Sequence, residues 1–320
     1  MNGVPLLPVN DVPLLVVGAG GLLGRNVVAA SPQAVPVSGV PWSSPQQAQE
    51  ALRRVAGRMK RDGRPWQVAW CAGTGFVGAS AASMEGEAAV LGAFLEALER
   101  ATVPVQAVLL ASSAGAVFAG SKDDPISEHS APAPVAVYGR EKLAQETIAQ
   151  TWCDRTGIPV VVGRISNLYG PGQDLSKPQG LVSRLVRSSL THQPITIFVP
   201  MDTLRDYLYV RDAGRLVVDA LQRAARTRPA GSRFTVKILA AGRATTVAEL
   251  VAELRRIRRK APPIVFARTL LSVLQPVRLR FRSAVWQELD ATPRTGIPAG
   301  IHSVIADQVG MIRTGALTPG

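Results

Sequence analysis

The chain has 320 residues, of which 47% are apolar, so it is long and apolar enough to fold into about two domains, and disorder is excluded as its main state. It carries 36 Lys and Arg against 23 Asp and Glu, and this formal charge of +13 predicts anionic partners such as phosphates, nucleic acid or an acidic membrane surface. Cys71, Cys153 and three scattered histidines stand at no ligand spacing, so we expect neither a disulfide framework nor a metal site.

We expect no secretion signal in the first residues of the sequence. No basic residue precedes its short apolar stretch, and Asp11 interrupts that stretch. The long uncharged windows at residues 65–84 and 101–120 contain Gly, Ser, Pro or Gln and lack the continuous apolar character of a membrane span. We therefore expect a cytoplasmic protein that does not enter a membrane.

Short β-branched or Leu-rich runs recur along the first half of the chain, separated by longer segments with apolar residues at helical spacing. Runs that are apolar on both faces are typical of strands buried in a parallel sheet. The expected strands are residues 14–17, 34–37, 68–71, 105–110 and 159–162, and two of the helices between them are residues 46–59 and 85–101. This repeated βαβ order predicts an α/β fold with a doubly wound parallel sheet of the Rossmann type.

A glycine-rich turn joins the first expected strand to the first helix. Gly18, Gly21 and Gly24 stand at GxxGxxG spacing, and Leu22 and Leu23 open the helix. Glycine is needed where such a turn is tight, where the backbone approaches a pyrophosphate, and where the helix packs on the strand. The strand–turn–helix context therefore predicts a dinucleotide-binding turn.

Tyr138 and Lys142 stand four residues apart in a segment expected to be helical, which places both side chains on one face. A lysine at this position favours the phenolate, so we expect it to lower the pKa of Tyr138 from about 10 towards the working pH. The phenol could then exchange a proton with a substrate hydroxyl. Such a pair is more often a solvated helix face, but its place one βα unit after Ser112 and Ser113 favours chemistry.

The character of the chain changes after Tyr169, where glycines and prolines gather at residues 170–180. Further on, Thr246 and Glu249 form the spacing of a capping box at the start of an amphipathic segment, residues 246–260. We expect a dinucleotide-binding domain of residues 1–169 and approximately 205–242. A smaller C-terminal α/β domain, approximately residues 170–204 and 243–320, is expected to bind the substrate.

Six segments in this order resemble the extended short-chain dehydrogenase/reductases, and within them the NAD-dependent epimerase/dehydratase family that acts on nucleotide sugars. The resemblance covers nearly the whole chain. It rests on the glycine turn, on Tyr138 with Lys142, and on four further segments: Val-Ala-Trp-Cys-Ala-Gly at 68–73, Ser-Ser-Ala-Gly-Ala-Val-Phe at 112–118, Arg-Ile-Ser-Asn-Leu-Tyr-Gly-Pro-Gly at 164–172 and Arg-Asp-Tyr-Leu-Tyr-Val-Arg-Asp at 205–212.

The resemblance implies a role for each matched position. Tyr138 is implied as the general acid/base, Lys142 as the residue that binds the nicotinamide ribose and tunes the phenol, and Ser113 as the hydrogen-bond partner of the reacting hydroxyl or carbonyl. The implied cofactor-binding residues are Gly18, Gly21, Leu22, Leu23, Gly24, Ser38, Cys71, Ala72, Gly73, Tyr138, Lys142, Ile165 and Ser166, and the substrate-binding residues are Ser113, Asn167, Arg205 and Arg278.

Two of the substrate-binding assignments have structural alternatives. Arg205 suits a diphosphate because its guanidinium offers bidentate donors, and an ion pair with Asp206 or Asp212 is the alternative. Arg278 is implied as a second phosphate contact, and a solvated basic face is its alternative.

Residues 251–320 hold eleven basic and four acidic side chains, so more than half of the net charge lies in this stretch.

Two departures from the family pattern bear on the reaction. Ser38 stands at the end of the second strand, where an acidic residue usually binds the adenosine ribose of NAD, and no arginine replaces it before Arg53. This leaves NAD and NADP both open, with NAD preferred. The catalytic serine is assigned to Ser113, with Ser112 as its rival, because the usual position holds Ala114.

The residues after the serine argue against dehydration. Sugar 4,6-dehydratases carry an Asp-Glu pair directly after their catalytic threonine, whereas Ala114 and Gly115 follow here. The expected activity is therefore nucleotide-sugar epimerisation, most simply at C4, by transient hydride transfer to bound NAD. A keto-sugar reductase or dehydrogenase that consumes NAD(P)H is the alternative, and a dinucleotide-binding scaffold without activity is a third reading.

The expected partners follow from this activity. A nucleotide-diphosphate sugar is the expected substrate, and the resemblance implies a homodimer through helices near residues 85–101 and 138–152. Aromatic residues make up only 5% of the chain, and no stacking module or reading helix is visible, so no nucleic acid partner is expected.

Overall fold

The computed structural model of the chain describes residues 11–73, 86–177, 179–226, 233–267 and 276–317. The chain forms two compact units, each assembled from separate stretches of sequence. The first unit contains Met1–Ser113, Val137–Arg164 and Gly214–Lys237, and the second contains Ala114–Ala136, Ile165–Ala213 and Ile238–Gly320.

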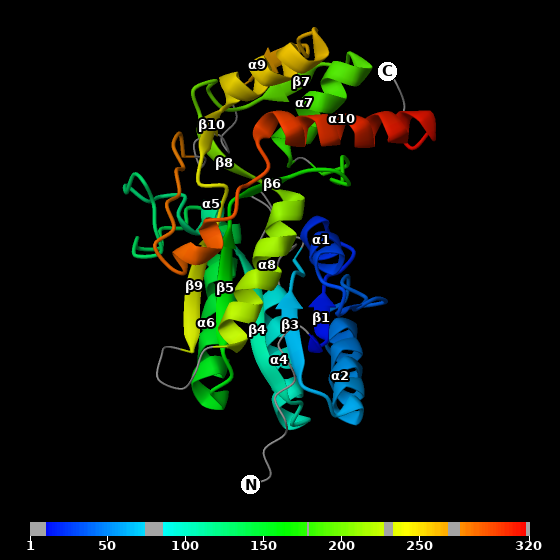
Figure 1. Cartoon of the computed structure of the whole chain (residues 1–320), viewed down its shortest axis with the longest axis vertical. Helices are drawn as coiled ribbons and strands as arrows, with labels where there is room; N and C mark the ends of the chain where they lie inside the picture. Colours follow the sequence, from blue (N-terminus) through cyan, green and yellow to red (C-terminus); the bar gives the residue numbers. More distant parts are fainter. Residues whose placement is uncertain (1–10, 74–85, 178, 227–232, 268–275, 318–320) are drawn as a thin grey trace. The chain divides into compact units, whose positions relative to one another are not determined.

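The first unit is built on a six-stranded sheet in the order β2-β1-β3-β4-β5-β9 (Figure 1). The pairs β1–β2, β1–β3 and β3–β4 are parallel. Because β2 and β3 flank β1 on opposite sides, the strand order reverses at β1, which is the switch point of a doubly wound fold. The strands are β1 (Leu14–Val17), β2 (Ala34–Pro36), β3 (Trp66–Trp70), β4 (Val105–Ser113), β5 (Val160–Ile165) and β9 (Phe234–Leu239).

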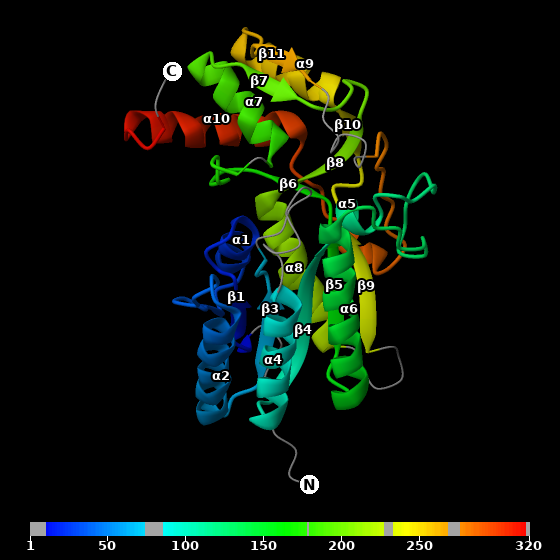
Figure 2. The ribbon, with the colours of Figure 1, turned by 180° about the vertical axis from the view of Figure 1, so that it is seen from behind.

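Helices cover both faces of this sheet. On one face α2 (Pro45–Asp62), α4 (Glu87–Arg100) and α6 (Val137–Thr156) lie side by side (Figure 2). On the other face lie α1 (Leu22–Ala30) and α8 (Val210–Ala225), and a Cβ at Gly214 of α8 would come within 2.3 Å of the Asn26 oxygen on α1. Gly214 thus permits the close approach of these two helices.

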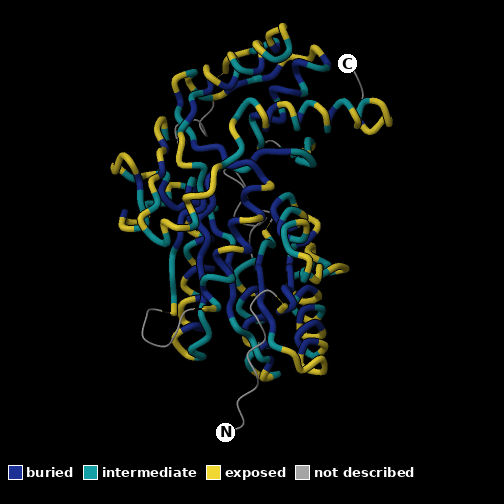
Figure 3. Tube along the Cα trace, in the orientation of Figure 1, coloured by how far each residue is buried: buried dark blue, intermediate teal, exposed yellow. Residues whose placement is uncertain are grey.

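The core of the first unit explains why the sequence folds in this way. All four residues of β1 and all five of β3 are buried, as expected for strands covered on both faces (Figure 3). The buried face of α2 consists of Ala48, Leu52, Val55, Ala56 and Met59, which recur at helical spacing against the sheet. The expected parallel Rossmann architecture is confirmed.

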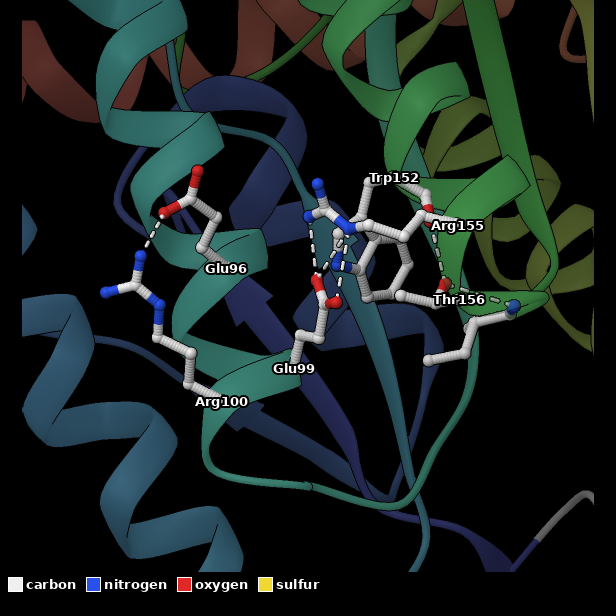
Figure 4. A network of polar contacts seen from close by, with 7 residues as sticks. Glu96, Glu99, Arg100, Trp152, Arg155 and Thr156 are labelled. Carbon is white, nitrogen blue, oxygen red and sulfur yellow. Dashed lines mark hydrogen bonds and ion pairs between the residues drawn. The ribbon is translucent and has the colours of Figure 1, made fainter.

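An exposed polar network ties α6 to its neighbour α4. Arg155 on α6 donates to Glu99 on α4 through Nη2 at 2.7 Å and Nε at 3.1 Å, and Figure 4 shows this fork beside Trp152 and Thr156. Arg100 and Glu96 form a second pair along α4, at 3.1 Å. Exposed pairs of this kind contribute only about 0–1 kcal/mol each, so apolar packing between the helices supplies most of the attachment.

The described residues of the second unit form two small sheets and three longer helices. β8 (Leu204–Tyr209) lies between β10 (Ala244–Thr246), which is antiparallel to it, and β6 (Asn167–Tyr169), which is parallel. The second sheet pairs β7 (Ile195–Ile197) with β11 (Ile264–Phe266). The helices are α7 (Leu181–Thr191), α9 (Val247–Arg258) and α10 (Ile297–Arg313), with short α5 (Ala114–Val117) and η3 (Gln287–Asp290).

The capping box expected at the start of α9 is confirmed. The Glu249 amide donates to Thr246 Oγ1 at 3.0 Å, and the Thr246 amide donates to Glu249 Oε2 at 2.6 Å. Two amide groups at the helix N-terminus that lack partners within the helix are thereby satisfied. The helix expected at residues 85–101 is α4, and residue 85 lies outside the described part of the chain.

The described helices give no support to a membrane-spanning segment. Within the described ranges, no helix combines the length and the apolar character needed to cross a bilayer.

Candidate active site

The glycine turn after β1 is closed tightly on itself. Gly18 has φ +83°, and the Gly21 amide donates to the Gly18 carbonyl at 3.0 Å. A Cβ at Gly24 would lie 2.2 Å from the Gly18 oxygen, and a Cβ at Gly18 would lie 2.6 Å from the Ala72 nitrogen. These two positions therefore exclude side chains, for the steric reasons that a dinucleotide-binding turn requires.

The other expected cofactor residues of the first unit follow the ends of neighbouring strands. Val37 donates its amide to Val16, which places the exposed Ser38 just beyond β2. The Cys71 amide donates to the Val17 carbonyl at 2.8 Å, so Cys71, Ala72 and Gly73 leave β3 beside the glycine turn. In an open α/β sheet this edge, at the strand reversal, is where ligands bind.

Tyr138 and Ser113 meet through a hydrogen bond between their side chains. Burial raises the pKa of Tyr138 to about 12, the hydrogen bond with Ser113 lowers it, and the negative charge of Glu87 raises it. We expected Lys142 to lower the pKa of Tyr138 below its ordinary value. That expectation was wrong, because the pKa of this phenol is raised. Burial and a carboxylate outweigh the groups that favour the phenolate.

Lys142 lies beneath the phenol, almost fully buried. Its ammonium is 5.9 Å from the centre of the Tyr138 ring and donates to Gln145 Oε1 at 3.1 Å. Burial lowers the pKa of Lys142, and the carboxylates of Glu87, Glu141 and Glu146 oppose that shift. A Cβ at Gly73 would lie 3.2 Å from this ammonium and 3.3 Å from Glu87 Oε2, so both charges converge on the exposed glycine.

The two candidate serines have different partners. The Ser112 hydroxyl donates to Glu146 Oε1 at 2.6 Å, in a buried contact away from Tyr138. Ser113 is the serine that bonds to the Tyr138 side chain. This arrangement supports Ser113 as the residue that faces a reacting group.

Four residues that sequence reasoning did not assign also belong to this site: Glu87, Gln145, Glu146 and Arg164. Gln145 links Lys142 to Glu87, because its Nε2 donates to Glu87 Oε2 at 3.4 Å. Glu141 caps the first turn of α4 by accepting from the Ala88 amide at 3.1 Å. The helical spacing of Glu146, four residues after Lys142, could have indicated it, but nothing in the sequence near Glu87 indicates a role.

The expected residues of the second unit gather around a buried carboxylate. Asp206 is fully buried, and its Oδ1 accepts from the Ser166 hydroxyl at 2.6 Å and from the Ala241 amide at 2.9 Å. The Asn167 side chain donates to the Asp206 carbonyl at 3.0 Å, and Ile165 is buried beside Ser166. Burial raises the pKa of Asp206, and these hydrogen bonds act against that shift.

The Arg205 guanidinium donates to main-chain carbonyls. Its Nη1 donates to the Leu204 carbonyl at 2.8 Å and to the Val277 carbonyl at 3.4 Å, while Asp206 bonds to Ser166 and Ala241 instead. Burial lowers the pKa of Arg205. Arg278 is exposed and follows Val277, and a β-bridge joins it to Leu204. Both arginines therefore stand at the start of β8.

The described residues contain no group of three or more His, Cys, Asp and Glu side chains that could hold a metal ion.

A doubly wound sheet, a glycine turn free of side chains, and a serine–tyrosine–lysine group on β4 and α6 define an α/β enzyme of the short-chain dehydrogenase/reductase class. Within this class, the chain belongs to the NAD dependent epimerase/dehydratase family, whose sequence pattern matches residues 14–234.

Curated relatives include both epimerases and a reductase. An uncharacterized UDP-glucose epimerase of Bacillus subtilis, YtcB, is 33% identical over 93 residues, which are 29% of this chain and 28% of that protein. A dTDP-4-dehydro-6-deoxyglucose reductase of Escherichia coli is 33% identical over 105 residues, 33% of each chain. The chain thus matches only about a third of the length of these relatives.

Solved structures share the fold over nearly the whole chain. The UDP-glucose 4-epimerase of Brucella ovis, solved in complex with NAD, superimposes with a TM-score of 0.77 at 21% identity. The superposition covers 92% of this chain and 98% of that one. At this identity the likeness concerns the fold alone.

Proposed function

We propose that this chain is a nucleotide-sugar epimerase that inverts the sugar at C4 with NAD as its resident cofactor. The observation that carries the proposal is the Ser113–Tyr138 hydrogen bond, with the buried Lys142 ammonium beneath the phenol ring. A tyrosine between a hydroxyl and an ammonium can take a proton from an alcohol as its phenolate and return that proton as the phenol. Epimerisation by way of a 4-keto sugar needs this proton exchange twice.

The residues of the first unit fit a dinucleotide. Gly18 and Gly24 leave room for a pyrophosphate where any Cβ would strike backbone, and α1 begins at Leu22 with no side-chain cap on its first turn. Ser38 would meet the adenosine ribose, and Lys142 with Gly73 would meet the nicotinamide ribose. The absence of a carboxylate at Ser38 also permits NADP. When bound, the nicotinamide supplies the hydride acceptor and donor of the reaction.

The chain's own residues would handle the proton. Tyr138 accepts the proton of the C4 hydroxyl when the 4-keto sugar forms, and donates it back when the hydroxyl forms again on the opposite face. Ser113 donates a hydrogen bond that favours the phenolate. The ammonium of Lys142, 5.9 Å from the centre of the ring, is a positive charge that would favour the phenolate as well. Holding these groups in line with C4 lowers the barrier by orientation.

Ala114 and Gly115 after Ser113 favour epimerisation over dehydration, since neither can act as the extra acid and base that loss of water requires. Curated relatives include epimerases, a reductase and dehydratases, so the reductase is the second candidate. It would use the same Tyr138, Lys142 and Ser113. The two differ in cofactor: a reductase consumes NAD(P)H, whereas an epimerase restores its nicotinamide in each cycle.

The second unit is proposed to bind the nucleotide part of the substrate. Arg205 is half-buried and its guanidinium donates to the main-chain carbonyls of Leu204 and Val277, whereas a diphosphate would give it a charged, bidentate partner. Asn167 would hold the sugar end, and the exposed Arg278 would add a second phosphate contact. UDP- and dTDP-sugars are the proposed substrates, in line with the names of the relatives.

We also propose that the enzyme is a cytoplasmic homodimer. The family resemblance implies a four-helix interface made by α4 and α6 of each copy. Ala144, Thr147 and Thr151 are exposed on α6 and carry short side chains, which would let helices approach closely. Light scattering after gel filtration would measure the mass, and a monomer at assay concentrations would refute the dimer.

The activity is tested by incubating the purified protein with UDP-, GDP- and dTDP-sugars, with and without added NAD(P)H. An epimerase converts one C4 isomer into the other without net change in the absorbance of reduced cofactor. Steady consumption of NAD(P)H with a single reduced product would identify a reductase instead. Tyr138→Phe should lower turnover by about 10²–10⁴-fold. Turnover near the wild-type rate in that variant would refute the proton relay.

A further inference from the structure

A buried ion pair lies beneath the Ser113–Tyr138 contact. Arg164, at the end of β5, donates to Glu146 on α6 through Nη2 to Oε2 at 2.7 Å and through Nε to Oε1 at 3.1 Å. The two side chains are only 6% and 7% exposed. This is a bidentate fork in which both carboxylate oxygens have an arginine donor, so the geometry of the pair is fixed in plane and direction.

Ser112 gives the same carboxylate a third hydrogen bond. Its hydroxyl donates to Glu146 Oε1 at 2.6 Å, and the contact is buried. One carboxylate thus joins the last residues of β4, the middle of α6 and the last residues of β5. Each of these elements carries a residue assigned to the site: Ser113 follows Ser112 on β4, and Tyr138 and Lys142 lie on α6.

The spacing on α6 makes this connection direct. Tyr138, Lys142 and Glu146 are separated by four residues each, so they rise along one face of the helix in successive turns. A shift or rotation of α6 against β4 would therefore move Tyr138 relative to Ser113. The Ser112–Glu146 contact opposes that motion two turns below the phenol.

A gain in folding stability does not explain why this ion pair is buried. Removing two charges from water is costly, and replacing a buried ion pair with apolar residues of similar volume is often neutral or stabilising. Apolar packing is non-directional, however, and does not fix one residue against another as a fork and a hydroxyl do. The distinguishing contribution of the three polar groups is the relative position of the elements that they join.

We propose that Ser112, Glu146 and Arg164 form a positioning network for the reaction. The network holds the Ser113 hydroxyl and the Tyr138 phenol at the relative position that the reaction requires. The inference rests on the proposed function of Tyr138 and Ser113. None of the three residues touches the reacting atoms in this assignment. Glu146 also acts on Lys142 through its charge, which raises the pKa of that ammonium against the effect of burial.

The decisive variant removes all three polar groups together: Ser112→Ala, Glu146→Leu and Arg164→Met in one chain. No buried polar atom of the network is then left without a partner, so the protein is expected to fold with a melting temperature close to that of the wild type. We expect kcat to fall about 100-fold, since a displacement of about 1 Å can cost that much. KM should change less than about threefold, because substrate contacts remain.

A milder pair of variants covers the case in which the triple variant does not fold. Ser112→Ala removes one contact of the carboxylate and leaves the ion pair, and we expect kcat to fall about tenfold with an unchanged KM. Ser112→Thr keeps the hydroxyl and should restore turnover. Wild-type kcat in the folded triple variant, or in Ser112→Ala, would overturn the positioning role. Equal loss in the Ala and Thr variants would overturn it as well.

A second readout separates this proposal from the proposed function. Amide hydrogen exchange should quicken at the end of β4 and in the first turns of α6 in the variants, and stay unchanged in α2. If the wild-type protein converts no nucleotide sugar, the proposed activity fails, and the exchange data alone decide on positioning. Unchanged protection at β4 and α6 would then refute the network.

Discussion

The glycine turn offers the sharpest test of cofactor binding, because the structure separates glycines that must lack a side chain from one that need not. A Cβ at Gly24 would lie 2.2 Å from the Gly18 oxygen and 2.8 Å from the Ala19 Cα, both backbone atoms. Gly20 in the same turn is exposed and has no atom within 4 Å of the corresponding position. Gly24→Ala is therefore expected to deform the turn, and Gly20→Ala is its matched control.

The size of the effect follows from the overlap. A carbon–oxygen contact of 2.2 Å falls short of ordinary packing distance by roughly 1 Å, so the α1 helix or the Gly18 peptide must move by that amount. Overpacking of this kind costs about 1–3 kcal/mol of folding free energy. Displacement of the turn should also weaken NAD binding, because the backbone amides that face the pyrophosphate move with it.

Two measurements check this prediction. Titration calorimetry with NAD should show weaker binding to Gly24→Ala than to the wild type, and thermal unfolding should show a lower midpoint. Gly20→Ala should match the wild type in both. Wild-type affinity in Gly24→Ala, or equal losses in the two variants, would show that the tight turn is not the cofactor cradle.

Two further predictions concern the phenol. Ser113→Ala should lower turnover far more than Ser112→Ala, because only Ser113 bonds to Tyr138; the reverse order in steady-state rates would transfer the role to Ser112. Glu87→Gln removes a charge that raises the pKa of Tyr138 and of Lys142, so both pKa values fall and the pH optimum of kcat should move to lower pH. Glu87→Asp should keep the wild-type profile, and an unmoved optimum in Glu87→Gln would contradict the reasoning.

The local part of the site could be predicted from the sequence. The glycine turn and the Tyr138–Lys142 pair are set by spacing within one turn or one helix, and strand and helix periodicities placed both correctly. Two strand ends were underestimated: the run expected to end at residue 110 continues to Ser113 as β4, and the run expected to end at 162 continues to Ile165 as β5. Apolar pattern fades there because polar residues occupy the edge where ligands bind.

The non-local part could not be predicted, because it depends on pairs far apart in the chain. Ser112 lies 34 residues from Glu146, and Arg164 lies 18 residues from it, so no helical or strand period links the three. The pKa of Tyr138 shows the same limit. Spacing reveals the nearby lysine, but burial and the carboxylate of Glu87 are set by packing between helices.

The partners of the basic side chains bear on which of them could bind an anion. Several basic residues after position 250 have local partners: Arg256 pairs with Glu253 at 2.9 Å, Arg258 donates to Ser189, and Arg294 donates to the Leu289 carbonyl. Arg205 differs, because desolvation lowers the pKa of its half-buried guanidinium, and that group donates to neutral main-chain carbonyls. A partly desolvated guanidinium gains more from an incoming phosphate than a solvated one, so Arg205 matters more for anion binding than the formal excess of +13.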